Sequence, residues 1–305
     1  PTPLTRLSLM SRTATTLIAY GMLLPALVLL GLFTFYPVIY GAFLGFTNYT
    51  VANVGSGEPP RWVGLANFVK VLQDPLFITG ILNSLKYLIV VPVLQLASLA
   101  VAVLVNQKLP LVNFFRAAYY IPVITSISLA AVMWEWVYAQ KGIINWLLTK
   151  IGVLAETQTF GFLGNPATAL WAIMFVTFWQ GFGYYMVLYL AGLQAIPGEL
   201  EEAATLDGAS SWGRFWLIIV PLMRPTILLC SLLSTLAAVR VLQEVIVFTD
   251  GGPLNSTYTA LMYVYSKAFK AFDYGVASAA GLVVALVGLG LSYLNFRLTR
   301  GGEET

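Results

Sequence analysis

The sequence has no histidine, a single cysteine and few charged residues. Without histidine, the chain can form neither an imidazole metal site nor a histidine-based catalytic triad or proton relay. The one cysteine, Cys230, lies in an apolar run and cannot form a disulfide within the chain. The phosphate-binding pattern G-x-x-x-x-G-K-[ST] is also missing from the sequence. If ATP drives this protein, we therefore expect another chain to hydrolyse it.

The low charge accompanies a high apolar content. Charged residues make up 10% of the chain and hydrophobic residues 59%, whereas soluble domains carry about 25% charged residues. The net charge is only +3 and the basic residues are scattered, so nucleic acid is not an expected partner. This composition predicts an all-α polytopic membrane protein embedded in a lipid bilayer.

Apolar stretches of about 20 residues are long enough to cross a bilayer. Six occur, at residues 17–46, 83–106, 113–138, 167–195, 215–247 and 274–297. An even number of spans places both termini on the same side. The loops on that side carry Arg6, Arg12, Lys108, Arg116, Arg214, Arg224, Arg297 and Arg300, and the other loops carry Arg61, Lys70, Lys141, Lys150, Lys267 and Lys270. This bias favours cytoplasmic termini, but only weakly.

Residues 195–221, between the fourth and fifth spans, form the most charged segment of the chain. Pro197 suits the first turn of a helix, and acidic residues favour the positive N-terminal end of that helix. Asp207-Gly208 ends it, because glycine accepts the left-handed conformation of a C-terminal cap. Ser210 or Ser211 can cap a second helix. The acidic residues of the first turns are Glu199, Glu201 and Glu202.

The surface of this segment suits contact with another protein. Ala203 and Ala204 have such small side chains that a partner could approach the backbone closely. Glu202 and Asp207 offer charge-assisted contacts at the edge of that surface. The alternative is an ordinary amphipathic loop between two spans.

This segment resembles the EAA loop of ABC-importer permeases, whose pattern is E-A-A, then D and G, and later I-x-L-P. The matching residues are Glu202, Ala203, Ala204, Asp207, Gly208, Ala209 and Pro221, with Val220 in place of the leucine. The resemblance implies a cytoplasmic coupling loop, residues 196–221, that sits in a cleft of an ATPase subunit. The whole pattern is correctly spaced between two apolar runs, which favours a coupling loop over an ordinary amphipathic loop.

Polar side chains within the fourth and fifth spans are candidates for lining a solute cavity, because polar groups in hydrocarbon are costly unless paired or hydrated. Gly181 and Gly183 lie among them, and we attribute these glycines to close helix packing. Arg240 and Glu244 are four residues apart and are expected to share a helical face as an opposite-charge pair. The cavity candidates are Trp179, Gln180, Tyr184, Tyr185, Arg240, Gln243 and Glu244.

Two further stretches resemble the carbohydrate subgroup of these permeases. Residues 249–253 match its T-x-G-G-P turn, and residues 62–68 match its F-V-G-L-x-N-F phrase. The subgroup usually carries F-x-x-F-D-x-I where this chain has residues 239–246, which keep a carboxylate but lack the phenylalanines. The identity of the solute is therefore less secure than the family.

The resemblance implies a type I ABC-importer permease fold and a carbohydrate substrate, such as an oligosaccharide or glycoside. It implies four partners: a second homologous permease, two ATPase subunits and an extracytoplasmic sugar-binding protein. No catalytic residue, metal or cofactor is expected in this chain, because ATP and Mg²⁺ belong to the ATPase subunits. The expected location is a bacterial or archaeal plasma (inner) membrane.

The expected organisation has three parts. Residues 1–78 form a cytoplasmic N-terminus, the first span and an external loop; residues 79–298 form the permease core; residues 299–305 form a cytoplasmic tail.

Other functions are weighed beside this one. A permease for a polyol or glycerol phosphate fits the same family. An ion-coupled secondary transporter would need a mid-membrane ion site and often repeated halves, and no convincing internal repeat is visible. A membrane enzyme acting on a lipid-linked sugar would have only the glutamates of residues 199–202 to use.

Overall fold

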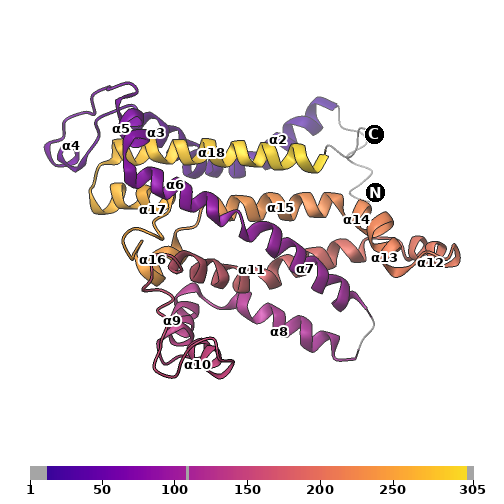
Figure 1. Cartoon of the computed structure of the whole chain (residues 1–305). Helices are drawn as coiled ribbons and strands as arrows, with labels where there is room; N and C mark the ends of the chain where they lie inside the picture. Colours follow the sequence, from indigo (N-terminus) through magenta and orange to yellow (C-terminus); the bar gives the residue numbers. More distant parts are fainter. Residues whose placement is uncertain (1–11, 108–109, 301–305) are drawn as a thin grey trace.

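The computed structural model describes residues 12–107 and 110–300. In this part of the chain every element is helical, apart from one isolated β-bridge between Thr47 and Trp62. Helices run between two ends of the molecule (Figure 1). One end holds α12 (Gly198–Leu206) and α13 (Ser211–Arg214), close to the start of α2 (Arg12–Leu30) and the finish of α18 (Tyr274–Arg300). The opposite end holds the shorter elements α4 (Val51–Ser56), α5 (Ala66–Gln73), α10 (Ile143–Lys150), α16 (Gln243–Thr249), α17 (Ala260–Tyr265) and η3 (Ser266–Lys270).

Four of the six predicted spans are continuous helices, at Ile18–Leu44, Pro75–Asn106, Ala169–Gln194 and Tyr274–Leu298. The first is α2 continued by η1 (Gly31–Phe35) and α3 (Tyr36–Leu44), and α3 packs against α18. The second consists of α6 (Pro75–Tyr87) and α7 (Val90–Asn106) and begins at Pro75 rather than at residue 83. It starts there because Asp74 accepts a hydrogen bond from the backbone nitrogen of Leu76 at 2.9 Å, and Pro75 occupies the first turn.

The other two predicted spans are bent. Residues 113–138 form α8 (Val112–Ile124) and α9 (Ile127–Tyr138). The direction changes by 100° between α8 and the arm Ile127–Lys150, which contains α9 and α10. The fifth span turns by 69° between its initial part, residues 211–222, and α15 (Arg224–Val239). That initial part consists of α13, η2 (Phe215–Ile219) and α14 (Val220–Leu222). The described residues therefore contain six spans when each bent pair counts as one.

Helix α11 (Ala169–Gln194) lies at the centre and packs against α7, α8 and α15. A glycine permits one of these approaches, because a Cβ at Gly183 would collide with the carbonyl oxygen of Tyr119 on α8. Gly181 has more room, since a Cβ there would lie 3.4 Å from Leu94. The packing explanation therefore holds for Gly183, whereas Gly181 faces a cavity described below.

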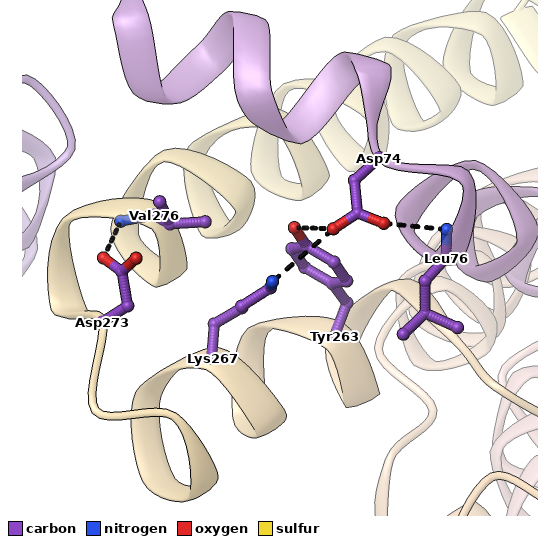
Figure 2. A network of polar contacts seen from close by, with 6 residues as sticks. All are labelled: Asp74, Leu76, Tyr263, Lys267, Asp273 and Val276. Carbon is purple, nitrogen blue, oxygen red and sulfur yellow. Dashed lines mark hydrogen bonds and ion pairs between the residues drawn. The ribbon is translucent and has the colours of Figure 1, made fainter.

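At the opposite end, three side chains join the start of α6 to α17 and η3 (Figure 2). We call Asp74, Tyr263 and Lys267 the Asp74 clamp. The carboxylate of Asp74 accepts a hydrogen bond from the Tyr263 hydroxyl at 2.7 Å, and Lys267 Nζ lies 3.5 Å away. Burial raises the pKa of Asp74, but the bonds from Tyr263 and Leu76 and the charge of Lys267 outweigh it, so the pKa lies below its ordinary value.

Candidate functional site

The acidic loop, residues 196–221, is built as two short helices that meet at a glycine turn. α12 begins at Gly198, with Pro197 at the N-cap position rather than inside the first turn. Gly208 has a φ of 77°, and its backbone nitrogen donates to the Thr205 carbonyl. The nitrogen of Ala209 donates to the Ala204 carbonyl at 3.0 Å. These two bonds form the Schellman cap that the Asp-Gly pair predicted.

The second helix of the loop is fixed to the first. Ser210 caps α13, because its hydroxyl accepts a hydrogen bond from the backbone nitrogen of Gly213 at 3.1 Å. Arg214 at the end of α13 donates to the Thr205 hydroxyl of α12 at 2.6 Å and to the Ser211 hydroxyl at 3.2 Å. The two helices therefore form one unit that can move together.

The predicted contact residues differ in how they are presented. Ala204 is buried, with 7% of its surface exposed, so Ala203 alone of the alanine pair offers an open surface. Leu206 at the tip of α12 is 89% exposed, although it is apolar. The Glu201 side chain lies outside the part that the structure describes. The exposed members of the predicted set are Glu199, Glu202, Ala203, Asp207 and Gly208, while Ala209 is half-buried.

The loop continues directly into the bent fifth span. α14 contains Pro221, and Met223 separates it from α15, which has Pro225 in its first turn. The 69° bend lies between these two prolines, as the sequence predicted for a kinked inner end. The bend therefore lies between the acidic loop and α15.

Further along α15, a cavity of about 270 Å³ opens among α6, α7, α8, α11, α15 and α16. We call it the central cavity. Ligand pockets commonly measure roughly 300–1,000 Å³, so this one is near the lower limit. Four predicted candidates line it, namely Gln180, Tyr184, Tyr185 and Glu244, and they share it with Tyr87, Thr177, Ser234 and a largely aliphatic wall.

Three of these candidates have defined contacts. Gln180 donates through Nε2 to the carbonyl oxygen of Thr125 at 2.7 Å, which lies at the break between α8 and α9. Gln180 therefore satisfies an exposed backbone carbonyl as well as lining the cavity. The rings of Tyr184 and Tyr185 meet edge to face, with centroids 5.2 Å apart. Aromatic faces and amide groups together suit a polyhydroxylated ring.

Three predicted cavity residues lie elsewhere. Trp179 packs edge to face against Trp134, with centroids 5.5 Å apart, and does not line the central cavity. Arg240 and Gln243 line a neighbouring cavity of about 560 Å³, and Glu244 lies at the boundary because it lines both.

The prediction that Arg240 and Glu244 share a helical face is wrong. α15 ends at Val239, and the chain is not helical again until Gln243. Within the described residues the two side chains form no ion pair. The break is stabilised from outside the span, because the Thr259 hydroxyl donates to the Val241 carbonyl at 2.9 Å.

The sequence interpretation missed a hydrogen-bond network that lies beside the central cavity. Tyr189 donates to Gln95 Oε1 at 2.6 Å, and Gln95 Nε2 donates to Ser234 Oγ at 2.7 Å and to the Cys230 carbonyl. This chain of bonds links α11, α7 and α15 beside the lining residue Ser234. Gln95 in the middle of an apolar run was the available signal, but its partners are distant in the sequence.

Comparisons with known proteins bear on this geometry. Residues 4–301 match the family described as "Binding-protein-dependent transport system inner membrane component". The lactose transport system permease protein LacF of Rhizobium radiobacter is 32% identical over 281 residues, which cover 90% of this chain and 92% of LacF. The diacetylchitobiose uptake system permease protein NgcF of Streptomyces coelicolor is 32% identical over 287 residues, covering 89% of this chain and 80% of NgcF.

Solved structures show the same fold. A chain of a bacterial alginate ABC transporter, in complex with an alginate pentasaccharide-bound periplasmic protein, superposes with a TM-score of 0.80. It shares 22% sequence identity, and the match covers 96% of this chain and 97% of that one.

Proposed function

The chain belongs to the inner-membrane components of binding-protein-dependent transport systems, and from that premise we propose that it is a permease subunit of an ATP-driven carbohydrate importer. Two relatives are permeases named for lactose and diacetylchitobiose, and a chain of the same fold belongs to a transporter in complex with an alginate-bound periplasmic protein. The tyrosine, amide and carboxylate groups of the central cavity support a polyhydroxylated solute.

ATP would act on a separate chain. This sequence lacks the phosphate-binding pattern of an ATPase, and its acidic loop presents an exposed apolar tip, Leu206, beside the exposed carboxylates Glu202 and Asp207. Such a surface suits a protein partner. The assembly would hold two ATPase subunits that bind ATP and Mg²⁺, a second homologous permease and an extracytoplasmic sugar-binding protein. The acidic loop and both termini would be cytoplasmic.

The observation that carries the proposal is the mechanical continuity between loop and cavity. Arg214 fixes α13 to α12, and α13 leads through the 69° bend into α15. Ser234 and Ala238 of α15 line the central cavity. A displacement of the loop by the closing ATPases would therefore move one wall of the cavity, and this movement would switch access from one side of the membrane to the other.

Two substitutions in the loop test this role. Glu202→Lys reverses a charge on the exposed face. Gly208→Pro is incompatible with the φ of 77° and removes the backbone N–H that donates to the Thr205 carbonyl. We expect each to abolish uptake and solute-stimulated ATP hydrolysis by the assembled complex, while membrane insertion persists. Gly198→Ala is the control, because a Cβ there meets nothing within 4 Å. Normal solute-stimulated hydrolysis in both loop variants would count against the proposal.

Energy coupling separates this function from an ion-coupled transporter. Uptake of lactose, cellobiose or diacetylchitobiose by vesicles containing the complex should require ATP and persist when ionophores collapse the ion gradients. Uptake that stops with the ionophore while ATP is present would favour a secondary transporter.

A further inference from the structure

The central cavity has an unbalanced charge. Among the described residues that line it, Glu244 is the only one with an ionisable carboxylate, and no lysine or arginine is present. The rest of the wall is aliphatic or carries neutral hydroxyl and amide groups. In surroundings of low dielectric constant, a single carboxylate dominates the local potential.

We propose that Glu244 makes the central cavity selective for polyhydroxylated solutes without a negative charge, namely neutral and amino sugars, against sugar acids and sugar phosphates. This inference rests on the proposed carbohydrate-import function and narrows its substrate class. Glu244 is half-buried at the start of α16, directly after the break that follows α15. The carboxylate can accept hydrogen bonds from sugar hydroxyls or pair with an ammonium group, but it repels a carboxylate or phosphate.

The buried hydroxyl of Tyr87 supports the binding of a polar solute in the central cavity. Tyr87 is fully buried and lines the cavity beside Thr177, and its hydroxyl makes no hydrogen bond of good geometry within the described part of the chain. A buried hydroxyl without a partner is costly. Tyr87 and Glu244 line the same cavity, so one solute can engage both groups. A hydroxyl or amino group of the solute would complete the hydrogen bonding of Tyr87 while contacting the carboxylate.

Within the part of the chain that the structure describes, Arg240 forms no ion pair with this carboxylate, although both residues line the neighbouring cavity. It lies on the far side of the break, lines the neighbouring cavity instead of the central one, and is exposed. Among the described residues, the ion pairs are Lys267 with Asp74 and Lys270 with Asp250, and neither includes Glu244. In residues 12–107 and 110–300, no basic side chain therefore pairs with the Glu244 carboxylate, which faces the central cavity.

The potential in the cavity can be measured without knowing the solute. In a Cys230→Ala background, Tyr184→Cys introduces a thiol on the cavity wall and Leu254→Cys introduces one at a position that is 89% exposed. Each is assayed in the assembled complex, with and without ATP, against a cationic trimethylammonium-ethyl and an anionic sulfonatoethyl methanethiosulfonate. The ratio of the two rate constants reports the local potential, because the reactivity of the thiol itself cancels.

We expect the ratio of the cationic to the anionic rate constant to be at least about tenfold higher at Tyr184→Cys than at Leu254→Cys. Glu244→Gln should remove this preference and Glu244→Lys should reverse it. Glu135→Gln, which removes an exposed carboxylate of α9 away from the cavity, should leave it unchanged. Equal ratios at the two positions, no response to Glu244→Gln, or no reaction with either reagent in either state would overturn the proposal.

Solute choice gives a second readout. Uptake of cellobiose, chitobiose and cellobiouronic acid is compared in wild type and Glu244→Lys with the same binding protein, so that its own preference cancels between them. We expect the substitution to raise uptake of the acid relative to the other two sugars by at least about tenfold. An unchanged order of preference would overturn the selectivity. If the thiol assay detects the negative potential but none of the sugars is carried, the carbohydrate function fails while the charge of the cavity stands.

Discussion

At the scale of single residues, the chain places its charges at defined positions. The carboxylate of Asp74 receives two hydrogen bonds and a lysine, whereas Glu244 has no cationic partner among the described residues. Asp74 serves structure because it joins two elements that are 189 residues apart in sequence. Glu244 faces a cavity and is free to act on a solute. These roles follow from surroundings that are not visible in the sequence next to either residue.

The lowered pKa of Asp74 predicts how the clamp depends on pH. A carboxylate whose pKa is lower in the folded state stabilises the fold above its unfolded value of about 3.9 and loses that contribution as the pH falls through the folded value. Asp74→Asn keeps an N-cap acceptor but removes the charge. Because the clamp is partly exposed, we expect Asp74→Asn to lower the free energy of unfolding by about 1 kcal/mol at pH 7.

Thermal unfolding of the purified complex between pH 3 and pH 8 tests this difference. The difference in unfolding temperature between wild type and Asp74→Asn should be constant above pH 5 and should disappear below about pH 4. Asp250→Asn is the matched control, because Asp250 pairs with Lys270 at a more exposed site and should contribute little. A difference in unfolding temperature that increases toward acid pH would contradict a stabilising role of the ionised Asp74 carboxylate.

At the scale of elements, the sequence predicted the long apolar helices well and their breaks poorly. The spans at Ile18–Leu44, Ala169–Gln194 and Tyr274–Leu298 agree with the prediction within a few residues, because length and apolar content define them. The break near Thr125 and the one at Arg240–Leu242 were missed. Each depends on a distant side chain, Gln180 or Thr259, that satisfies a carbonyl released by the break.

Helix packing at the centre gives the next prediction. Gly183→Ala places a methyl group against the Tyr119 carbonyl, so α8 and α11 must separate. We expect Gly183→Ala to lower the free energy of unfolding by ~1–3 kcal/mol or more, as in other overpacked cores. Gly181→Ala is the control, because its Cβ would make an ordinary contact with Leu94. Thermal unfolding of the two variants after detergent extraction compares them, and equal midpoints would show that the close approach at Gly183 contributes nothing.

At the scale of the whole molecule, the two helices and the glycine turn of the acidic loop were predicted, although Pro197 is an N-cap and Ala204 is buried, and the cavity was predicted only in part. The loop could be predicted because caps and glycine turns are local in sequence, as the Schellman cap at Gly208 shows. The cavity depends on how six helices meet, so Trp179 was wrongly expected in it and Tyr87 was overlooked. The arrangement also places the loop at the end opposite the T-x-G-G-P turn (Figure 1).

This polarity predicts the sidedness of two exposed leucines. Leu206 in the acidic loop and Leu254 in the turn at the opposite end are both 89% exposed. In a Cys230→Ala background, an impermeant maleimide added to intact cells or spheroplasts should label Leu254→Cys and leave Leu206→Cys unlabelled. Inside-out vesicles should give the reverse result. Labelling of both from the same side would exclude the proposed topology.

The central claim is that the acidic loop receives force from a separate ATPase, and a cross-link tests it most directly. A thiol-specific photocrosslinker attached at Leu206→Cys is activated in the assembled complex, and the adduct is identified by mass spectrometry. We predict an adduct with the ATPase subunit whose yield changes between the nucleotide-free and ATP-bound states, and none from Leu254→Cys. Absence of that adduct from an actively transporting complex would contradict the account.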